Sequence, residues 1–225
     1  MIIQNKSRIE IKAVLRSADF DKLQSWIVSE TDLFTLHPDR VNNNVYFETS
    51  RYSSATDNID GLSKRTKVRF RWYGDTETLS DSGKLEFKRK HNTEGCKDQY
   101  KINFLNKDLI AYKDIIKTIT SSLPLDRQIE FSDYSLPFIL NRYQRSYYST
   151  GDEKIRVTID KSIEAYDQRW SRNINKKIKI TLPDLVIVEF KFAPSNKPAS
   201  IKLMKNFPFR VSKHSKYINS VLHSR

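Results

Sequence analysis

Five short segments of the chain alternate apolar and polar residues with a period of two, which is typical of β-strands with one buried face. They are residues 8–12, 67–72, 84–88, 156–160 and 188–192. Residues 45–47 and 143–148 are further candidate strands. Short strands joined mostly by short turns predict a mainly antiparallel sheet or barrel.

Three amphipathic helices are predicted beside these strands, each with apolar residues on one face. Ser17 can cap the first, Asn106 can cap the second, and the third begins near Ser212. Pro124 predicts a firm stop after the second helix. The apolar faces are Phe20, Leu23, Trp26 and Ile27; Leu109, Ile110, Tyr112, Ile115, Ile116 and Ile119; and Tyr217, Ile218, Val221 and Leu222.

No long linker, low-complexity tract or fixed repeat interrupts the chain. The segments rich in Ser, Asp and Asn at residues 50–60 and 75–83 read as loops that leave one domain. We therefore predict a single α+β domain over residues 1–225.

Each predicted strand places its charged residues on the face opposite its apolar residues. On 67–72, for example, Lys67, Arg69 and Arg71 oppose Val68, Phe70 and Trp72. An ordinary sheet with a solvated charged face would give this pattern. A closed barrel would give it too, with the apolar faces packed on outer helices and the charges lining the lumen. A basic lumen needs an anion and some carboxylates, and glutamates on these faces could also hold a divalent cation.

The charge of the chain points to a polyanionic partner. Its formal net charge is +13 and its pI is about 9.7, which favours nucleic acid, polyphosphate, nucleotides or acidic lipid. The alternative is a basic surface that serves solubility. With only five glycines, the chain has no glycine-rich phosphate loop, so Arg and Lys side chains would have to hold phosphates.

Other chemistry finds little support in the sequence. Cys96 is the single cysteine, which excludes an intramolecular disulfide, and the four histidines lack metal-ligand spacing. No apolar stretch is long enough to span a membrane, and the first residues lack the apolar core of a signal peptide. We therefore expect a cytoplasmic protein.

Eight motifs in order along nearly the whole chain resemble the VTC (vacuolar transporter chaperone) polyphosphate polymerase domain. They are Arg8-Ile9-Glu10-Ile11-Lys12, Val45-Tyr46-Phe47-Glu48-Thr49, Arg69-Phe70-Arg71-Trp72-Tyr73-Gly74, Leu85-Glu86-Phe87-Lys88-Arg89-Lys90, Tyr143-Gln144-Arg145, Arg156-Val157-Thr158-Ile159-Asp160, Val188-Glu189-Phe190-Lys191 and Lys213-His214-Ser215-Lys216-Tyr217. Each motif alone is unspecific, and their common order carries the resemblance.

The resemblance implies the triphosphate tunnel fold, a closed antiparallel β-barrel of about eight strands with helices outside. It also implies transfer of the γ-phosphate of ATP to a growing polyphosphate chain with Mn²⁺ or Mg²⁺. The residues it assigns to phosphate are Lys12, Arg69, Arg71, Lys88, Arg145, Arg156, Lys213 and Lys216, with Lys90 and Lys97 as weaker candidates. Among them Arg69, Arg71, Lys88 and Arg145 would be catalytic. Glu189 would hold the metal, helped by Glu10 or Glu86.

Three alternatives to the polymerase stay open. The first is a triphosphatase of the same fold, whose opening strand usually carries an acid where this chain has Arg8. The second is a non-catalytic module that binds polyphosphate or inositol phosphates. The third is a nucleic-acid binder, which the placement of the strand aromatics opposite the charges disfavours. A membrane partner that exports the product is compatible with any tunnel activity, and the oligomeric state is open.

Overall fold

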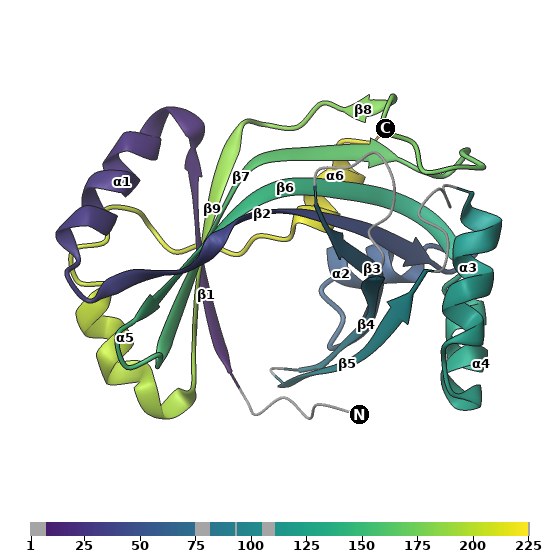
Figure 1. The fold of residues 1–225 in the computed structure, drawn as a ribbon, viewed down its shortest axis with the longest axis horizontal. Coiled ribbons are helices and arrows are strands. Elements are labelled where there is room, and N and C mark those ends of the chain that lie inside the picture. The colour runs from purple at the N-terminus through teal and green to yellow at the C-terminus, as the bar shows by residue number, and fades with distance from the viewer. Residues whose placement is uncertain (1–7, 75–81, 93, 105–110, 225) are drawn as a thin grey trace.

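The computed structural model describes residues 8–74, 82–92, 94–104 and 111–224. Its centre is one strongly curved antiparallel sheet with the strand order β1-β9-β7-β6-β2-β3-β4-β5, and β8 pairs with β7 (Figure 1). The strands are β1 (Ile9–Arg16), β2 (Leu33–Glu48), β3 (Lys64–Tyr73), β4 (Ser82–His91), β5 (Glu94–Asn103), β6 (Leu136–Thr150), β7 (Ile155–Asp167), β8 (Lys179–Ile180) and β9 (Leu185–Phe192). All seven predicted strands are present, while β5 and β8 were not predicted.

The helices of the described residues are α1 (Phe20–Ser29), α2 (Ser53–Ile59), α3 (Tyr112–Ser121), α4 (Leu125–Asp133), α5 (Lys197–Leu203) and α6 (Lys216–Leu222). Two pairs, α1 with α5 and α3 with α4, pack on the outside of the curve, whereas α6 and the adjacent α2 pack at one end of its inner side. Figure 1 shows α1 and α5 at one side of the molecule and α3 and α4 at the other. The apolar strand faces pack on these pairs, with Trp26 and Phe190 in one core and Phe70 and Ile119 in the other. The predicted division into an apolar outer face and a charged inner face is therefore confirmed.

We call the inner side the concave face, defined by Arg69, Glu86, Arg145, Glu189 and the residues in register with them. Helix α6 covers one end of it. The Tyr217 ring of α6 stacks on Tyr46 of β2 at 4.5 Å, and Asn141 of β6 donates a hydrogen bond of 2.7 Å to Ser220. A third apolar cluster, which includes Ile139 and Tyr217, fills this end.

The predicted closure of the barrel by strand pairing is wrong for the part of the chain that is described. The sheet ends at β1 and β5, and no described residues of these two strands pair with each other. The outer edge of β1 is instead taken by the segment before α6, where Ser212 donates a backbone hydrogen bond of 2.7 Å to Lys12. Between β1 and the strands β4 and β5, the described residues make side-chain contacts such as that of Lys88 of β4, which lies 3.7 Å from Glu10 of β1. We call this gap in strand pairing the seam.

Several predicted helix boundaries also need correction. Ser17 lies in a short 3-10 turn, and its hydroxyl donates to Asp184 rather than capping α1. Helix α6 begins at Lys216, with Ser215 as its cap, four residues later than the prediction near Ser212. Residues 50–60 are not simply a loop because they contain α2.

Two further boundaries concern the second predicted helix. Asn106, Leu109 and Ile110 lie outside the described residues, and α3 begins at Tyr112. Helix α3 ends before Pro124, as predicted, and Pro124 then occupies the N-cap position of α4. No helix in the described ranges is both long enough and apolar enough to cross a membrane.

Candidate phosphate-binding site

The wall formed by β3, β4 and β5 carries an excess of cations on the concave face. Lys67 of β3 lies directly opposite Lys88 of β4, which lies directly opposite Lys97 of β5. Like charges on directly opposed strand positions repel each other. The cations in register on this wall are Arg65, Lys67, Arg69, Arg71, Lys84, Lys88, Lys90, Lys97 and Lys101, and Glu86 is the only acid among its described concave positions.

Glu86 partly balances this wall from a fully enclosed position. It accepts a bond of 2.5 Å from Arg69 Nε and lies 3.3 Å from Lys97 Nζ. Burial would raise the pKa of Glu86, but Arg69, Arg71 and Lys97 outweigh burial and hold the pKa well below its ordinary value. Glu86 is therefore ionised, and its charge is already shared by two cations.

Lys67 shows how strongly the wall is charged. Its pKa falls to about 7, first because of burial and then because of repulsion from Lys88 and Lys12. The ammonium group donates to the hydroxyl of Ser215 at 3.1 Å and lies over the ring of Tyr217. No carboxylate among the described residues pairs with it, so an anion bound here would favour its protonated form.

A second group of charges faces this wall from β6, β7 and α6. Arg145 makes a bidentate ion pair with Asp160, with Nε 2.5 Å from Oδ1 and Nη2 2.7 Å from Oδ2. Lys216 pairs with the same carboxylate. Asp160 is only 1% exposed; burial would raise its pKa, but Lys216 and Arg145 lower the pKa to about 2. Tyr143 packs against both cations, 5.3 Å from Arg145 and 4.7 Å from Lys216.

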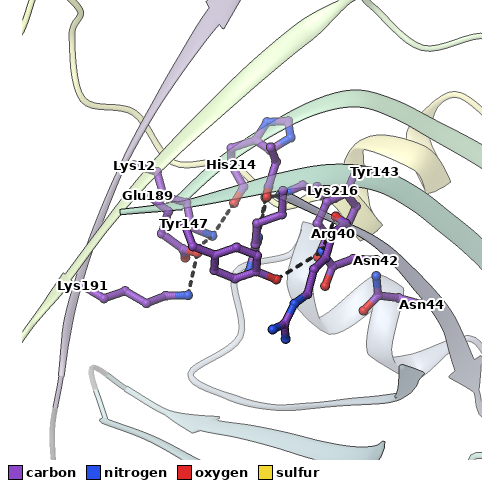
Figure 2. Close-up of polar contacts among 12 residues, drawn as sticks. Lys12, Arg40, Asn42, Asn44, Tyr143, Tyr147, Glu189, Lys191, His214 and Lys216 are labelled. Atoms are coloured by element: carbon purple, nitrogen blue, oxygen red, sulfur yellow. Dashed lines mark hydrogen bonds and ion pairs between the residues drawn. The ribbon is translucent and has the colours of Figure 1, made fainter. Parts of the chain in front are cut away.

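The third group joins β1 and β9. Glu189 lies 3.5 Å from Lys12 and 2.7 Å from Lys191, and these contacts keep its pKa low despite burial. Lys12 also donates to the backbone oxygen of His214 at 3.1 Å. In the view of Figure 2, Glu189 and its two lysines lie on one side of Tyr147, and Arg40 and Asn44 lie on the other.

Uncharged groups from β2 and β6 complete the centre of the concave face. Arg71 donates to Asn44 Oδ1 at 2.7 Å and to the hydroxyl of Tyr143 at 3.5 Å. Because neither partner carries a full charge, the charge of Arg71 is not neutralised by these contacts. The nearby Asn42 amide contacts the Tyr147 hydroxyl at 3.5 Å.

The remaining predicted phosphate ligands lie at the rim. Lys213 is exposed, as is Arg156, which lies at the beginning of β7 directly opposite Lys191. Burial and repulsion from Arg65, Lys213 and Lys88 lower the pKa of Lys90, so these cations lie close enough to interact electrostatically. The rim is thus an extension of the central charges, and the roles of its residues stay predictions.

The predicted metal ligands do not converge on one point. Glu189 and Glu10 lie on paired strands, but Lys12 and Lys191 are the residues directly opposite them, and Glu86 lies on β4. The described residues contain no group of three side chains of the His, Cys, Asp or Glu types that could hold a metal. A divalent ion fits only in the mode where one or two carboxylates and phosphate oxygens share it. The role of Glu189 as a metal ligand stays a prediction.

Sequence reasoning left out several residues that the structure brings into this site. They are Lys67, Lys191, Asp160, Tyr143, Asn42, Asn44 and Tyr147. Strand alternation placed Lys67 and Lys191 on the charged faces of their strands, but neither residue was assigned to phosphate. It could not have found Asp160 as the partner of Lys216, because that contact joins residues far apart in the chain.

Several solved structures have a fold similar to that of this protein. A candidate adenylate cyclase from Bacillus halodurans is 15% identical with a TM-score of 0.54, covering 93% of this chain and 94% of its own. The candidate adenylyl cyclase HpAC1 from Hippeastrum, described as having a dominant triphosphatase activity, is 15% identical with a TM-score of 0.53 and covers 93% of each chain. A candidate adenylate cyclase from Vibrio parahaemolyticus is 11% identical with a TM-score of 0.52, covering 96% of this chain and 98% of its own.

The sequence of the chain shows the family to which the protein belongs. Residues 7–224 match the VTC domain, so the protein belongs to the VTC domain family. This confirms the resemblance drawn from the eight motifs. No curated protein sequence matches the chain.

Proposed function

We propose that the concave face binds a chain of phosphates and transfers a phosphoryl group from ATP to polyphosphate. The observation that carries this proposal is the row of Lys67, Lys88 and Lys97 on three adjacent strands. Glu86 is the only acid among the described concave positions of these strands, and Glu10 of β1 lies 3.7 Å from Lys88. Three opposed lysines destabilise a sheet unless an anion lies over them. A linear polyanion with one charge per phosphate would neutralise such a row.

The arrangement suits phosphoryl transfer because that reaction asks mainly for positioning and stabilisation of charge. Arg69 and Arg71 on one side and Arg145 and Lys216 on the other would hold donor and acceptor phosphates between them. Their ion pairs and hydrogen bonds fix these side chains before the substrate arrives, which is the preorganisation that electrostatic catalysis needs. The incoming phosphate is itself the nucleophile, so no side-chain nucleophile is required.

Glu189, with Glu10 on the neighbouring strand, would hold Mn²⁺ or Mg²⁺ together with phosphate oxygens. When bound, such an ion would supply Lewis acidity and offset negative charge on the transferred group. Lys12 and Lys191 now occupy the oxygens of Glu189, and both could turn to phosphate when a metal and its substrate bind.

Hydrolysis of triphosphates is the second candidate function, and one feature of the fold favours it. Helix α6 covers one end of the concave face, with Tyr217 against Tyr46 and Ser220 bonded to Asn141. A growing chain would have to leave by the other end or by the seam between β1 and β5, whereas a triphosphatase needs only one opening. HpAC1, which has the same fold, is described as a triphosphatase.

The deciding experiment incubates purified protein with ATP and Mn²⁺ and follows polyphosphate on gels and orthophosphate in solution. Polyphosphate chains would support the polymerase, and orthophosphate without chains would replace it by the triphosphatase. Tight polyphosphate binding with neither product would leave a binding module.

The matched variants are Arg71→Ala and Lys154→Ala. Among the described residues, the hydrogen bonds of Arg71 go to the neutral groups of Asn44 and Tyr143, so its removal breaks no direct ion pair. We expect activity to fall by about a hundredfold with the fold intact. Lys154 is an exposed cation in the turn before β7, and its removal should leave the rate unchanged. Equal rates for Arg71→Ala and wild type would contradict the site assignment.

A further inference from the structure

One loop outside the phosphate site exposes a large aromatic side chain. Trp170, in the segment 168–178 between β7 and β8, is 89% exposed, whereas the other two tryptophans, Trp26 and Trp72, are 4% and 1% exposed. Ile178 at the other end of the loop is 67% exposed. Trp170 thus leaves most of its apolar surface in water, and burial of this surface by a partner would be favourable.

The exposure does not result from a loosely attached loop. Gln168 is buried and bridges the loop: its amide donates to the Asn175 backbone at 2.8 Å, and its oxygen accepts from Tyr112 Oη at 2.7 Å. Asn175 in turn accepts from the backbone of Lys177 at 2.8 Å and of Ile178 at 3.2 Å. The loop backbone is therefore fixed in a shape that holds Trp170 away from the protein.

Basic residues predominate in and beside the loop that carries the two exposed apolar side chains. Between residues 164 and 179 there are five Arg and Lys and only two acids, namely Arg169, Arg172, Lys176, Lys177 and Lys179 against Glu164 and Asp167. The two acids pair with Lys179 and Arg169. Arg172 and Lys177 are exposed and form no ion pair within the described part of the chain. The loop thus carries two exposed cations without an acidic partner and one exposed indole.

We propose that this loop is a docking surface for a membrane leaflet that contains anionic phospholipids. Indole rings favour the boundary between acyl chains and headgroups because they have an apolar body and a polar N–H. Arg172 and Lys177 would lie at the depth of anionic headgroups, whose surface potential attracts basic segments. Charge complementarity and shallow burial of Trp170 and Ile178 would act together.

The loop fits lipid better than other polyanions or a protein. A single-stranded nucleic acid would need several aromatic platforms, and Ile178 offers no flat ring on which a base can stack. A stable protein interface would need a larger contiguous surface than two apolar side chains. The proposal does not depend on the phosphate site, which lies on the concave face.

The test uses vesicles of phosphatidylcholine alone or with phosphatidylserine, in the presence of saturating tripolyphosphate to occupy the concave face. Because Trp26 and Trp72 are buried, a blue shift of tryptophan fluorescence reports mainly on Trp170. We expect a blue shift and co-sedimentation only with the anionic vesicles. Absence of both would overturn the proposal.

Variants separate the loop from general electrostatic attraction. Trp170→Ser should weaken partition into anionic vesicles by about tenfold. The double change Arg172→Ala and Lys177→Ala should also weaken it and reduce its salt dependence. Val28→Ser removes an equally exposed apolar residue on α1 and should change nothing.

Two results would overturn the lipid assignment even if the protein sediments. Unchanged binding of Trp170→Ser, with thermal unfolding like wild type, would show that another surface binds the vesicles. A blue shift with single-stranded oligonucleotides and none with vesicles would assign the loop to nucleic acid instead.

Discussion

Asp160 illustrates how a single carboxylate organises the cations of the site. It is buried between Arg145 and Lys216, and its removal would leave two cations close together in a region of low solvent access. The pairing lowers the pKa of Asp160 to about 2, so the ionised carboxylate stabilises the fold above the ordinary Asp pKa of about 3.9. That contribution is lost as the pH falls from about 4 through about 2.

We predict that Asp160→Asn lowers the free energy of unfolding by about 3 kcal/mol at neutral pH, because it leaves buried cations without their partner. Tripolyphosphate should restore much of this loss by supplying the missing negative charge. Urea denaturation with and without tripolyphosphate measures both effects. Asp152→Asn, in an exposed ion pair, is the control and should leave the free energy of unfolding unchanged. An equal loss for both variants would contradict the role given to Asp160.

Lys67 gives a prediction about protons. In the folded protein the pKa of Lys67 is about 7, below the ordinary value of 10.5, so folding disfavours the charged form. The unfavourable contribution of Lys67 to the free energy of unfolding therefore grows as the pH falls from about 10 to about 7. A bound polyanion would raise this pKa, so binding of tripolyphosphate at pH about 8 should take up protons. Calorimetry in buffers of different ionisation enthalpy measures the uptake.

Lys67→Met is the variant that isolates this proton. It should reduce the uptake while tripolyphosphate still binds, because the other cations of the concave face remain. The same uptake in the variant would place the titrating group elsewhere.

At the scale of elements, strand positions could be predicted and several helices could not. Strands β1, β3, β4, β7 and β9 follow from strict alternation of residue types. Strand β5 was missed because Asp98 interrupts its apolar row, where it pairs with Arg89 of β4. Helix α4 was missed because two of its apolar residues, Leu125 and Ile129, face solvent and only Phe131 is buried.

The predicted site had a similar limit. Alternation assigns Arg69, Glu86 and Glu189 to charged faces from local sequence alone. It says nothing about which strands face each other across the fold, so it could not show that Glu86 and Glu189 lie apart. Closure of the sheet likewise depends on long-range register between β1 and β5, which no local pattern specifies.

Helix α6 gives the element-scale prediction. The Tyr217 hydroxyl donates a hydrogen bond to Glu48, which is fully buried. Burial raises the pKa of Glu48, although the hydrogen bond from Tyr217 acts in the opposite direction. Tyr217→Phe would leave a carboxylate oxygen without this donor, so we predict a loss of about 1–3 kcal/mol in unfolding free energy. Tyr52→Phe, at a more exposed ring, should cost less than about 0.5 kcal/mol.

Chemical denaturation of the two variants decides this point. If Tyr217→Phe were as stable as Tyr52→Phe, α6 would not be fastened to β2 through Glu48. Weak attachment would also mean that α6 could leave the concave face, which would remove the main structural argument for a triphosphatase.

At the scale of the whole molecule, the net charge of +13 could act through general attraction or through the concave face. The two differ in how individual lysines contribute to binding of long-chain polyphosphate. This polymer condenses counterions as nucleic acid does, so each cation that contacts it adds to the dependence of affinity on salt. Lys88 is suited to the test because its side chain is 53% exposed and its loss should not disturb folding.

We predict that Lys88→Ala weakens polyphosphate binding and reduces the slope of log affinity against log salt by about one. Lys154→Ala removes the same charge from an exposed turn and should leave both quantities unchanged. Titration calorimetry over a series of salt concentrations gives the slopes. If the two variants behaved alike, attraction would come from net charge alone. A selective effect of Lys88 would instead place the polymer along the row of opposed lysines, where β3, β4 and β5 hold more positive charge than Glu86 can balance.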